Sequence, residues 1–443
     1  MMATNTKHSE SIKLIAAAKV GDVSGVTAAL RAGADKEAVD PERNNFKALH
    51  WSAENGHKDV VVRLLNMGVN VDAREDRGRS ALHQVSFFGQ EEVAGLLIGR
   101  GVVVDAVGEE QFTPLMAASQ EGHKQIALLL LDAGANIDFT DEAGESSVHY
   151  ASRNGRDSMV QFLASYGADI KLKDNEDNDG SRPIHIAAIE GHDLTVKTLL
   201  QQGADVNCID NEGFTPLWVA SQEGHDKVVE ILLENKAQVN FEHSQGATAL
   251  TIASENGHAS TAHVLITHGA NIDYTTSDGV NSLIHAAREG KDEVVSLLII
   301  YGANIEAVTN DGKTPLLMAC IHGQLNTAKI LLEEGANPRA CDKDGNTPTQ
   351  VAIKEGYNDL VSIMSNSPTE RLQSIHLNQD ASKSSSNTNS TPSGESKSPV
   401  SAATSNLECV VCMDPRTSTV MTMPCRHAVT CQKCTDNMES RGE

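Results

Sequence analysis

The sequence predicts an all-α solenoid of about eleven helix–turn–helix units joined by hairpin loops. An apolar segment that ends in glycine recurs at intervals of 33 residues, apart from one interval of 35 and one of 36. Such a fixed period indicates a stack of small units in which each contacts its neighbours. The aromatic content of 3% suits close packing of helices built on alanine and leucine. The recurrent glycines are Gly21, Gly56, Gly89, Gly122, Gly155, Gly191, Gly224, Gly257, Gly290, Gly323 and Gly356.

One unit shows why each period should hold two helices and a turn. Thr215 can cap a first helix with Pro216 at its first position, where a missing N–H costs nothing. Gly224 can end that helix in a left-handed conformation. Residues 227–233 then place apolar side chains at helical spacing, which predicts a second helix. In most units a second glycine closes this helix, and in one unit Lys236 stands there instead. These second glycines are Gly33, Gly68, Gly101, Gly134, Gly167, Gly203, Gly269, Gly302 and Gly335.

Turn signals follow the second helix. An Asp–Gly pair, which favours a tight hairpin turn, occurs in three units: Asp278-Gly279, Asp311-Gly312 and Asp344-Gly345. The two longer intervals place small insertions in the loops at residues 40–46 and 174–180. Loops at one edge of a stack absorb such insertions without disturbing its packing.

The repeated unit resembles the ankyrin repeat over residues 10–365. The resemblance implies a scaffold that binds proteins and has no catalytic residues of its own. It also implies terminal caps over residues 11–33 and 347–364. The motifs that carry it are Lys47-Ala48-Leu49-His50, Ser80-Ala81-Leu82-His83, Thr113-Pro114-Leu115-Met116, Arg182-Pro183-Ile184-His185, Thr314-Pro315-Leu316-Leu317, Gly134-Ala135-Asn136-Ile137 and Gly203-Ala204-Asp205-Val206-Asn207.

One pair of aromatic side chains is a candidate for partner binding. In the ankyrin family, the exposed positions include the two residues before the glycine between the helices. Most of these pairs are polar here, but one is Phe87 and Phe88 in a chain with eight phenylalanines. Exposed paired aromatics fit a protein-binding hot spot. The alternative, which we favour from the sequence, is that one packs inward between repeats and the other is incidental.

Five histidines follow the same glycine in different units. They lie about one repeat apart, too far from one another to share a metal ion. We therefore expect structural hydrogen bonds near a helix start, from His57, His123, His192, His225 and His258.

Charge and hydropathy restrict the partners. The formal net charge is −24, and the eight acids and seven bases from Ser367 onward leave about −23 on the repeats. Nucleic acid and anionic membranes are therefore poor partners for the solenoid, whereas a basic protein face would be attracted. The first ten residues contain no apolar stretch, and no segment is long enough to span a membrane. These features indicate an intracellular, cytoplasmic protein.

The C-terminal part changes character twice. Residues 367–406 lose the repeat and become rich in Ser, Asn and Thr, a composition that predicts a disordered linker. Beyond it, five cysteines and a histidine fall within 26 residues. Two Cys-x-x-Cys pairs around a Cys-x-His supply thiolate and imidazole ligands at the spacing of a zinc site. The ligands are Cys409, Cys412, Cys425, His427, Cys431 and Cys434.

This cysteine pattern resembles the RING finger, whose eight ligands hold two zinc ions in a cross-brace. The resemblance assigns the first zinc ion to the four cysteines of the two Cys-x-x-Cys pairs, Cys409, Cys412, Cys431 and Cys434. Cys425 and His427 would supply half of a second site, and the seventh and eighth ligands are absent from the sequence. By the same resemblance, Val411 belongs to the surface that recruits a ubiquitin-conjugating enzyme. Because two ligands leave the second site incomplete, we expect one tightly bound zinc ion. Because the recruiting surface would be half built, we expect little ubiquitin discharge.

The order of these parts resembles ankyrin–RING ubiquitin ligases, the mind bomb type among them. We expect an N-terminal tail at residues 1–9, a solenoid at 10–366, the linker at 367–406 and a partial RING-type finger at 407–443. The resemblance implies a substrate-selecting solenoid joined to a finger that recruits a conjugating enzyme. The alternative is a non-enzymatic ankyrin adaptor with a vestigial one-zinc finger. A hydrolase or kinase has no support, since the sequence contains no nucleotide loop and no nucleophile–base constellation.

Overall fold

The computed structural model of the protein describes residues 2–175, 179–243 and 246–365. Contacts divide the chain into two units, Met1–Asp380 and Ala381–Glu443, and the described residues all belong to the first. They form 22 α-helices, one short 3-10 helix and a pair of two-residue strands. The elements are α1 (Met2–Val20), α2 (Val23–Arg31), β1 (Val39–Asp40), β2 (Phe46–Lys47), α3 (Ala48–Glu54), α4 (Lys58–Asn66), α5 (Ala81–Phe88), α6 (Glu91–Gly99), η1 (Glu109–Gln111), α7 (Pro114–Glu121), α8 (Lys124–Asp132), α9 (Ser147–Arg153), α10 (Asp157–Ser165), α11 (Pro183–Ile189), α12 (Asp193–Gln201), α13 (Pro216–Glu223), α14 (Asp226–Glu234), α15 (Ala249–Asn256), α16 (Ala259–Thr267), α17 (Ser282–Glu289), α18 (Asp292–Ile300), α19 (Pro315–Ile321), α20 (Leu325–Glu333), α21 (Pro348–Glu355) and α22 (Asn358–Ser365).

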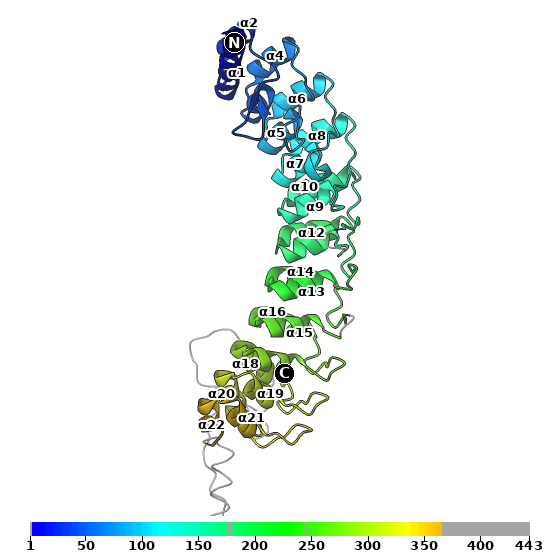
Figure 1. The fold of residues 1–443 in the computed structure, drawn as a ribbon. Helices are drawn as coiled ribbons and strands as arrows, with labels where there is room; N and C mark the ends of the chain where they lie inside the picture. The colour runs from blue at the N-terminus through cyan, green and yellow to red at the C-terminus, as the bar shows by residue number, and fades with distance from the viewer. Residues whose placement is uncertain (1, 176–178, 244–245, 366–443) are drawn as a thin grey trace, which may run out of the picture. The chain divides into compact units, whose positions relative to one another are not determined.

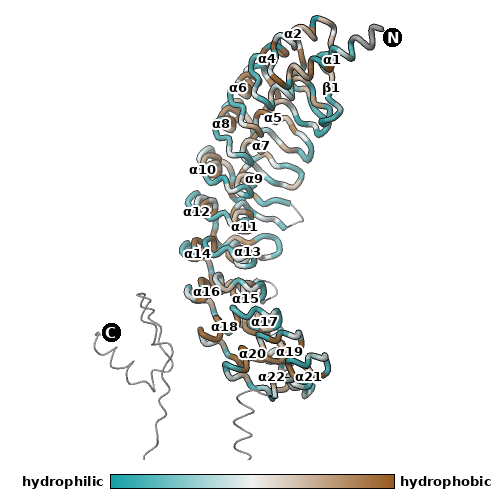
Figure 2. Tube along the Cα trace, turned by 90° about the vertical axis from the view of Figure 1, so that its left-hand side faces the viewer, coloured by the Kyte–Doolittle hydropathy of each residue, from teal (hydrophilic) through white to brown (hydrophobic). Residues whose placement is uncertain are grey.

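The helices are arranged as eleven antiparallel pairs, so the predicted all-α repeat fold is confirmed. Each odd-numbered helix packs against the next odd-numbered helix and against the even-numbered helix that follows it (Figure 1). Figure 2 shows the even-numbered helices on one side, the odd-numbered helices in the middle and hydrophilic loops on the other side. The odd-numbered helices therefore form an inner row between the outer helices and the loops.

The helix ends follow the predicted local chemistry. Thr215 Oγ1 accepts a hydrogen bond from the backbone N–H of Trp218 at 3.2 Å, and Pro216 occupies the first turn of α13. Gly224 ends α13 with a φ of 77°. Lys236, which replaces a glycine after α14, has a φ of 70°. A left-handed backbone costs a residue with a side chain about 1–2 kcal/mol, and the fold tolerates that cost at this position.

One continuous apolar core runs through the inner and outer helices, from Leu14 of α1 to Met364 of α22. Leucine, valine and alanine supply most of it, and alanines such as Ala53 and Ala118 let neighbouring helices approach closely. Burial of this kind is the main stabilising contribution in a stack, since each repeat covers the apolar face of the next. The first helix begins at Met2 and therefore includes residues for which the sequence predicted a tail.

The recurrent glycines fall into two registers with different surroundings. The first register ends the odd-numbered helices, and the second follows the even-numbered helices. A Cβ atom at Gly224, which ends an odd-numbered helix, would come within 2.4 Å of Nδ1 of His258 in the next repeat. A Cβ atom at Gly134, which follows an even-numbered helix, would meet nothing within 4 Å. The first register therefore needs glycine for backbone conformation and for packing, whereas the second needs it for conformation alone. This difference explains why Lys236 is accommodated in the second register.

The five histidines that follow the first glycine register bridge consecutive repeats. The ring Nε2 of each lies 2.8–3.1 Å from a backbone carbonyl oxygen of the preceding repeat. The predicted structural hydrogen bonds are therefore confirmed. Each histidine contacts the carbonyl of an inner-helix residue: His57 with Lys19, His123 with Phe87, His192 with Arg153, His225 with Ile189 and His258 with Gln222.

The loops form a second, polar connection between repeats. The carboxylate of Asp273 accepts the backbone N–H of Asn304 at 3.0 Å, and the same bond joins Asn240 to Asn271 at 2.8 Å. Equivalent bonds occur in most other repeats. At the first loop insertion, β1 and β2 pair as a short antiparallel hairpin. The Asp–Gly hairpin turns are also present, with positive φ at all three glycines.

Candidate functional site

Two groups of predicted site residues fall in different parts of the chain. The predicted linker and all six zinc ligands lie outside the described residues, as does Val411. Phe87 and Phe88 lie at the C-terminal end of α5, on the inner row. Among the described residues, no group of three or more His, Cys, Asp and Glu side chains could hold a metal ion. A zinc site in this protein must therefore use other ligands, and the thiolate pairs beyond residue 406 have the right chemistry.

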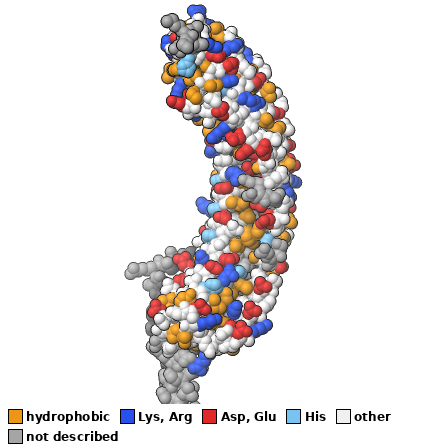
Figure 3. Space-filling view, in the orientation of Figure 1, with side chains coloured by type: hydrophobic (Ala, Val, Ile, Leu, Met, Phe, Trp, Pro, Cys, Tyr) orange, Lys and Arg blue, Asp and Glu red, His pale blue; other side chains and the backbone are white. Residues whose placement is uncertain are grey.

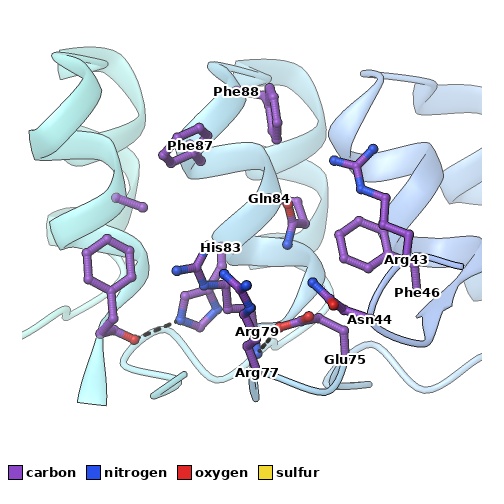
Figure 4. A pocket seen from close by; sticks show the side chains of 12 residues that line it. Arg43, Asn44, Phe46, Glu75, Arg77, Arg79, His83, Gln84, Phe87 and Phe88 are labelled. Carbon is purple, nitrogen blue, oxygen red and sulfur yellow. Dashed lines mark hydrogen bonds between the residues drawn. The ribbon is translucent and has the colours of Figure 1, made fainter. Parts of the chain in front are cut away.

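A hollow of about 190 Å³ opens beside α5 and includes both phenylalanines. We call it the α5 hollow. Figure 4 shows Phe87, Phe88 and Gln84 on α5, with Arg43 and Phe46 reaching in from the preceding repeat. The loop before α5, Phe112 just before α7 and Ala117 within α7 complete the wall. The lining residues are Arg43, Asn44, Phe46, Glu75, Arg77, Arg79, His83, Gln84, Phe87, Phe88, Phe112 and Ala117.

The two phenylalanines of the predicted hot spot occupy different environments. Phe87 is half-buried and packs against a small apolar cluster of Phe112, Met116 and Ala117. Phe88 is 43% exposed, and its ring meets that of Phe87 edge to face at 5.2 Å between centroids. One ring therefore belongs partly to the fold, whereas the other is available to a partner.

Arginine side chains surround the aromatic rings of the hollow. The Arg43 guanidinium lies 5.0 Å from the Phe46 ring centroid, and that of Arg79 lies 5.5 Å from the ring of Phe112. Such contacts hold a cation over the electron-rich face of a ring. Arg43 also forms an ion pair with Glu54 at 2.9 Å.

The backbone on both sides of the hollow is strained. Asn44 and Asn45 have φ of 46° and 54°, and Glu110 and Gln111 have φ of 58° and 63°. Glycine takes the place of Asn45 and Gln111 in the equivalent described loops, at Gly78, Gly144, Gly180, Gly213, Gly246, Gly279, Gly312 and Gly345. Each strained pair is followed directly by a phenylalanine of the hollow. Strain of about 1–3 kcal/mol per residue persists only where surrounding contacts hold it, often at functional sites.

His83 forms part of the wall and is a structural group. Its Nδ1 accepts the backbone N–H of Ser80 at 3.0 Å, and its Nε2 lies 3.0 Å from the carbonyl oxygen of Phe112. Burial lowers the pKa of His83 to about 4. The imidazole is therefore neutral at pH 7 and adds no charge to the hollow.

Sequence reasoning identified Phe87 and Phe88 but missed most of the site. Phe46, Arg79 and Phe112 occupy one register, the residue just before the N-cap of an inner helix. In other repeats this register holds Glu145, Ser181, Phe214, Ala247, Val280, Lys313 and Asn346. Aligning the loops by this register would have revealed two phenylalanines and an arginine in three consecutive repeats.

The comparisons with known protein families agree with this architecture. The family of ankyrin repeats matches residues 14–108, 96–174, 173–243, 235–309 and 283–371. The chain therefore belongs to the ankyrin-repeat proteins. A second family, the C3HC4-type zinc finger or RING finger, matches residues 405–443. This match implies zinc binding in the matched residues.

One curated relative has a short similar segment. Palmitoyltransferase AKR1 of Debaryomyces hansenii is 37% identical over 65 residues, which cover 15% of this chain and 8% of that protein. The chain thus spans a small fraction of the relative that it matches. None of the helices in the described residues is both long and apolar enough to cross a membrane. On the face drawn in Figure 3, acidic and basic side chains are interspersed.

Proposed function

We propose that the protein acts in RING-type ubiquitin ligation, with a solenoid that selects a protein partner and a finger that recruits a ubiquitin-conjugating enzyme. The observation that carries the proposal is the occurrence of both family matches in one chain. Ankyrin repeats bind proteins, and RING fingers position a ubiquitin-loaded conjugating enzyme without forming a covalent intermediate. The resemblance to mind bomb type ligases supports the same assignment.

Zinc would organise the recruiting surface. Cys409, Cys412, Cys431 and Cys434 supply the four thiolates of a complete tetrahedral site. Cys425 and His427 would contribute to a second, weaker site. Zinc would supply no redox chemistry here, and its binding free energy would contribute to the folding of the finger. The folded segment would then present Val411 to the conjugating enzyme.

Binding of a conjugating enzyme to the zinc-loaded full-length chain tests this proposal. Replacement of Val411 by alanine should weaken binding about thirtyfold, since interface anchors contribute on the order of 2 kcal/mol. The matched control is Val410→Ala, which removes the neighbouring side chain of the same Cys-x-x-Cys pair. Zinc content should be the same in both variants. Equal binding by the parent chain and Val411→Ala would contradict the proposed surface.

The alternative function is that of a non-enzymatic ankyrin adaptor. An adaptor would bind its protein partner and zinc but would not release ubiquitin from a loaded conjugating enzyme. Discharge measured with the full-length chain, with and without Cys409→Ser, separates the two functions. Zinc-dependent discharge supports the ligase. Partner binding without discharge by any enzyme of a representative panel supports the adaptor.

A further inference from the structure

The α5 hollow is lined by more arginines than carboxylates, unlike the surface as a whole. Three arginines line it, Arg43, Arg77 and Arg79, against a single lining carboxylate from Glu75, while Glu54 and Glu109 pair with Arg43 and Arg77 from outside the lining. The chain as a whole has a net charge of −24. Four phenylalanine rings share the same small space. The hollow therefore places positively charged hydrogen-bond donors beside an apolar wall. This arrangement can bind an acidic side chain next to a bulky apolar one.

The arginines have unused hydrogen-bonding capacity. Nε of Arg79 is buried and has no hydrogen-bond partner among the described residues. The ion pair between Arg77 and Glu109 is long, at 3.8 Å, and both side chains are more than half exposed. A buried donor without a partner costs free energy that an incoming acceptor would recover. Arg79 and Arg77 can therefore bind a carboxylate without losing a strong internal contact.

The strained loops give an independent indication of a site. Both described loops that lack glycine at the left-handed position flank this hollow, and both direct a phenylalanine into it. Asn45 is held by its side-chain amide, which donates to the Asp76 carboxylate at 2.8 Å. The backbone N–H of Glu142 in the next repeat donates to the carbonyl oxygen of Glu110 at 2.9 Å. Neighbouring repeats thus hold Phe46 and Phe112 in place before any partner arrives, which reduces the entropy lost on binding.

We propose that the α5 hollow binds an acidic segment of a protein partner, in which an aspartate or glutamate lies next to a large apolar residue. The carboxylate would lie between Arg77 and Arg79, and the apolar side chain would pack on Phe88 and Phe46. The proposal rests on the protein-binding part of the proposed function and names the chemistry of the partner. It does not depend on the activity of the zinc finger.

The overall negative charge does not prevent this binding. At physiological ionic strength, charges more than about 8 Å apart are largely screened from one another. Direct contacts inside the hollow therefore decide which side chain is accepted, whereas the distant acids mainly slow its approach. The expectation of a basic partner concerns the surface as a whole, and the hollow is a local exception to that surface.

Selection from a random dodecapeptide library by the full-length protein tests the proposal. We expect enrichment of peptides in which Asp or Glu adjoins Phe, Tyr, Leu or Ile. A synthetic peptide of the selected sequence should bind at least about tenfold more weakly when its acidic residue becomes the corresponding amide, because one charge-assisted hydrogen-bonded pair is lost. Enrichment of basic peptides, or no enrichment at all, would overturn the proposal.

Matched variants then locate the binding. Arg79→Glu and Arg77→Glu should each reduce affinity for the selected peptide about tenfold or more. Arg77 is exposed, and Glu110 and Glu212 occupy its register in other loops, so that variant should fold normally. The control is Lys313→Glu, because Lys313 occupies the register of Arg79 in a distant repeat. Unchanged binding by both arginine variants would contradict the site.

Two further comparisons exclude other occupants. Phe88→Ser should weaken the peptide about tenfold, whereas Ile353→Ser, which alters an exposed apolar residue of α21, should not. A mixed single-stranded oligonucleotide should fail to compete, and competition by it would instead assign the hollow to nucleic acid. These measurements involve no conjugating enzyme. Failure of the parent protein to select an acidic peptide would therefore refute this inference, whereas failure of the parent protein to bind a conjugating enzyme would refute only the proposed function.

Discussion

The first and second halves of the solenoid build the same helix pair with different side chains at one register, which is buried in every inner helix compared here except α21. The register lies three residues after the N-cap of each inner helix. In the first half, α3 to α12, it holds His50, His83, Met116, His149 and His185. In the second half, α13 to α22, it holds Trp218, Thr251, Ile284, Leu317 and Gln350. Helix geometry is thus insensitive to this register, whereas the response to pH should depend on it.

The histidines of the first half are buried and hydrogen-bonded in the neutral form. Nδ1 of His50 accepts the N–H of Lys47 at 3.1 Å, and its Nε2 lies 3.0 Å from the carbonyl oxygen of Ala73. Burial lowers the pKa of each of the four histidines to about 4, from an ordinary value of 6.5. In the second half, burial also lowers the pKa of His285, but Glu255 opposes that shift.

The largest expected effect is therefore a loss of stability in acid that is much larger in the first half than in the second. Between pH 6.5 and 4 these histidines are protonated in the unfolded chain but neutral in the folded protein. Stability therefore falls as pH decreases through this window. From pH 7 to pH 5 the loss should be about 2 kcal/mol for each histidine, or about 8 kcal/mol for four. At pH values above 6.5 the contribution is fully present.

The two tryptophans allow each half to be followed separately, since Trp51 lies in α3 and Trp218 in α13. Denaturant unfolding of Trp218→Phe reports on the first half, and that of Trp51→Phe reports on the second. Between pH 7 and pH 5, the denaturant midpoint of the first half should decrease much more than that of the second half. Equal shifts in the two variants would break the proposed difference between the halves.

A second effect concerns the register itself. His185→Ala should destabilise the protein by about 3 kcal/mol, because it leaves the buried N–H of Arg182 and carbonyl of Phe214 without their partner. Thr251→Ala in the second half should cost about 1 kcal/mol, since only the contacts with Thr248 are lost. Urea unfolding at pH 7 gives both values, and a larger cost for Thr251 would contradict this ranking.

A third effect should be common to both halves. Gly89→Ala and Gly224→Ala should each cost about 2 kcal/mol or more, because backbone strain adds to a clash with the histidine of the next repeat. Gly134→Ala and Gly302→Ala, where no atom lies within 4 Å of the added Cβ, should cost about 1 kcal/mol. Thermal unfolding of the four variants tests the ranking. The ranking is wrong if Gly134→Ala and Gly302→Ala lower the unfolding temperature as much as Gly89→Ala and Gly224→Ala do.

The smallest expected effect is that of zinc removal on the solenoid. The described helices contain no cluster of metal ligands, and one continuous apolar core packs them together. Chelation of the full-length protein should therefore leave its helical circular dichroism and the midpoints reported by Trp51 and Trp218 unchanged. A fall in either midpoint would show that the stability of that half depends on metal.

The repeat and the caps of its helices were predictable because they depend on local chemistry at a fixed spacing. Thr215, Pro216 and Gly224 act within one helix, so their roles follow from the sequence alone. The α5 hollow was not predictable in the same way, since Phe46, Arg79 and Phe112 come from three repeats and meet only after stacking. The zinc ligands and the predicted linker lie outside the described residues, and their assignments stay predictions.

The contact between a glycine and the next repeat's histidine also bears on how such a chain can lengthen. A repeat such as the one containing Gly224 and His225 carries both partners, the glycine that receives a ring and the histidine that supplies one. His225 lies on Gly191 before it, and Gly224 lies beneath His258 after it. A duplicated copy of this segment would therefore meet its original through a contact that already fits. Tandem duplication can extend the array one unit at a time, without a compensating mutation at the new boundary.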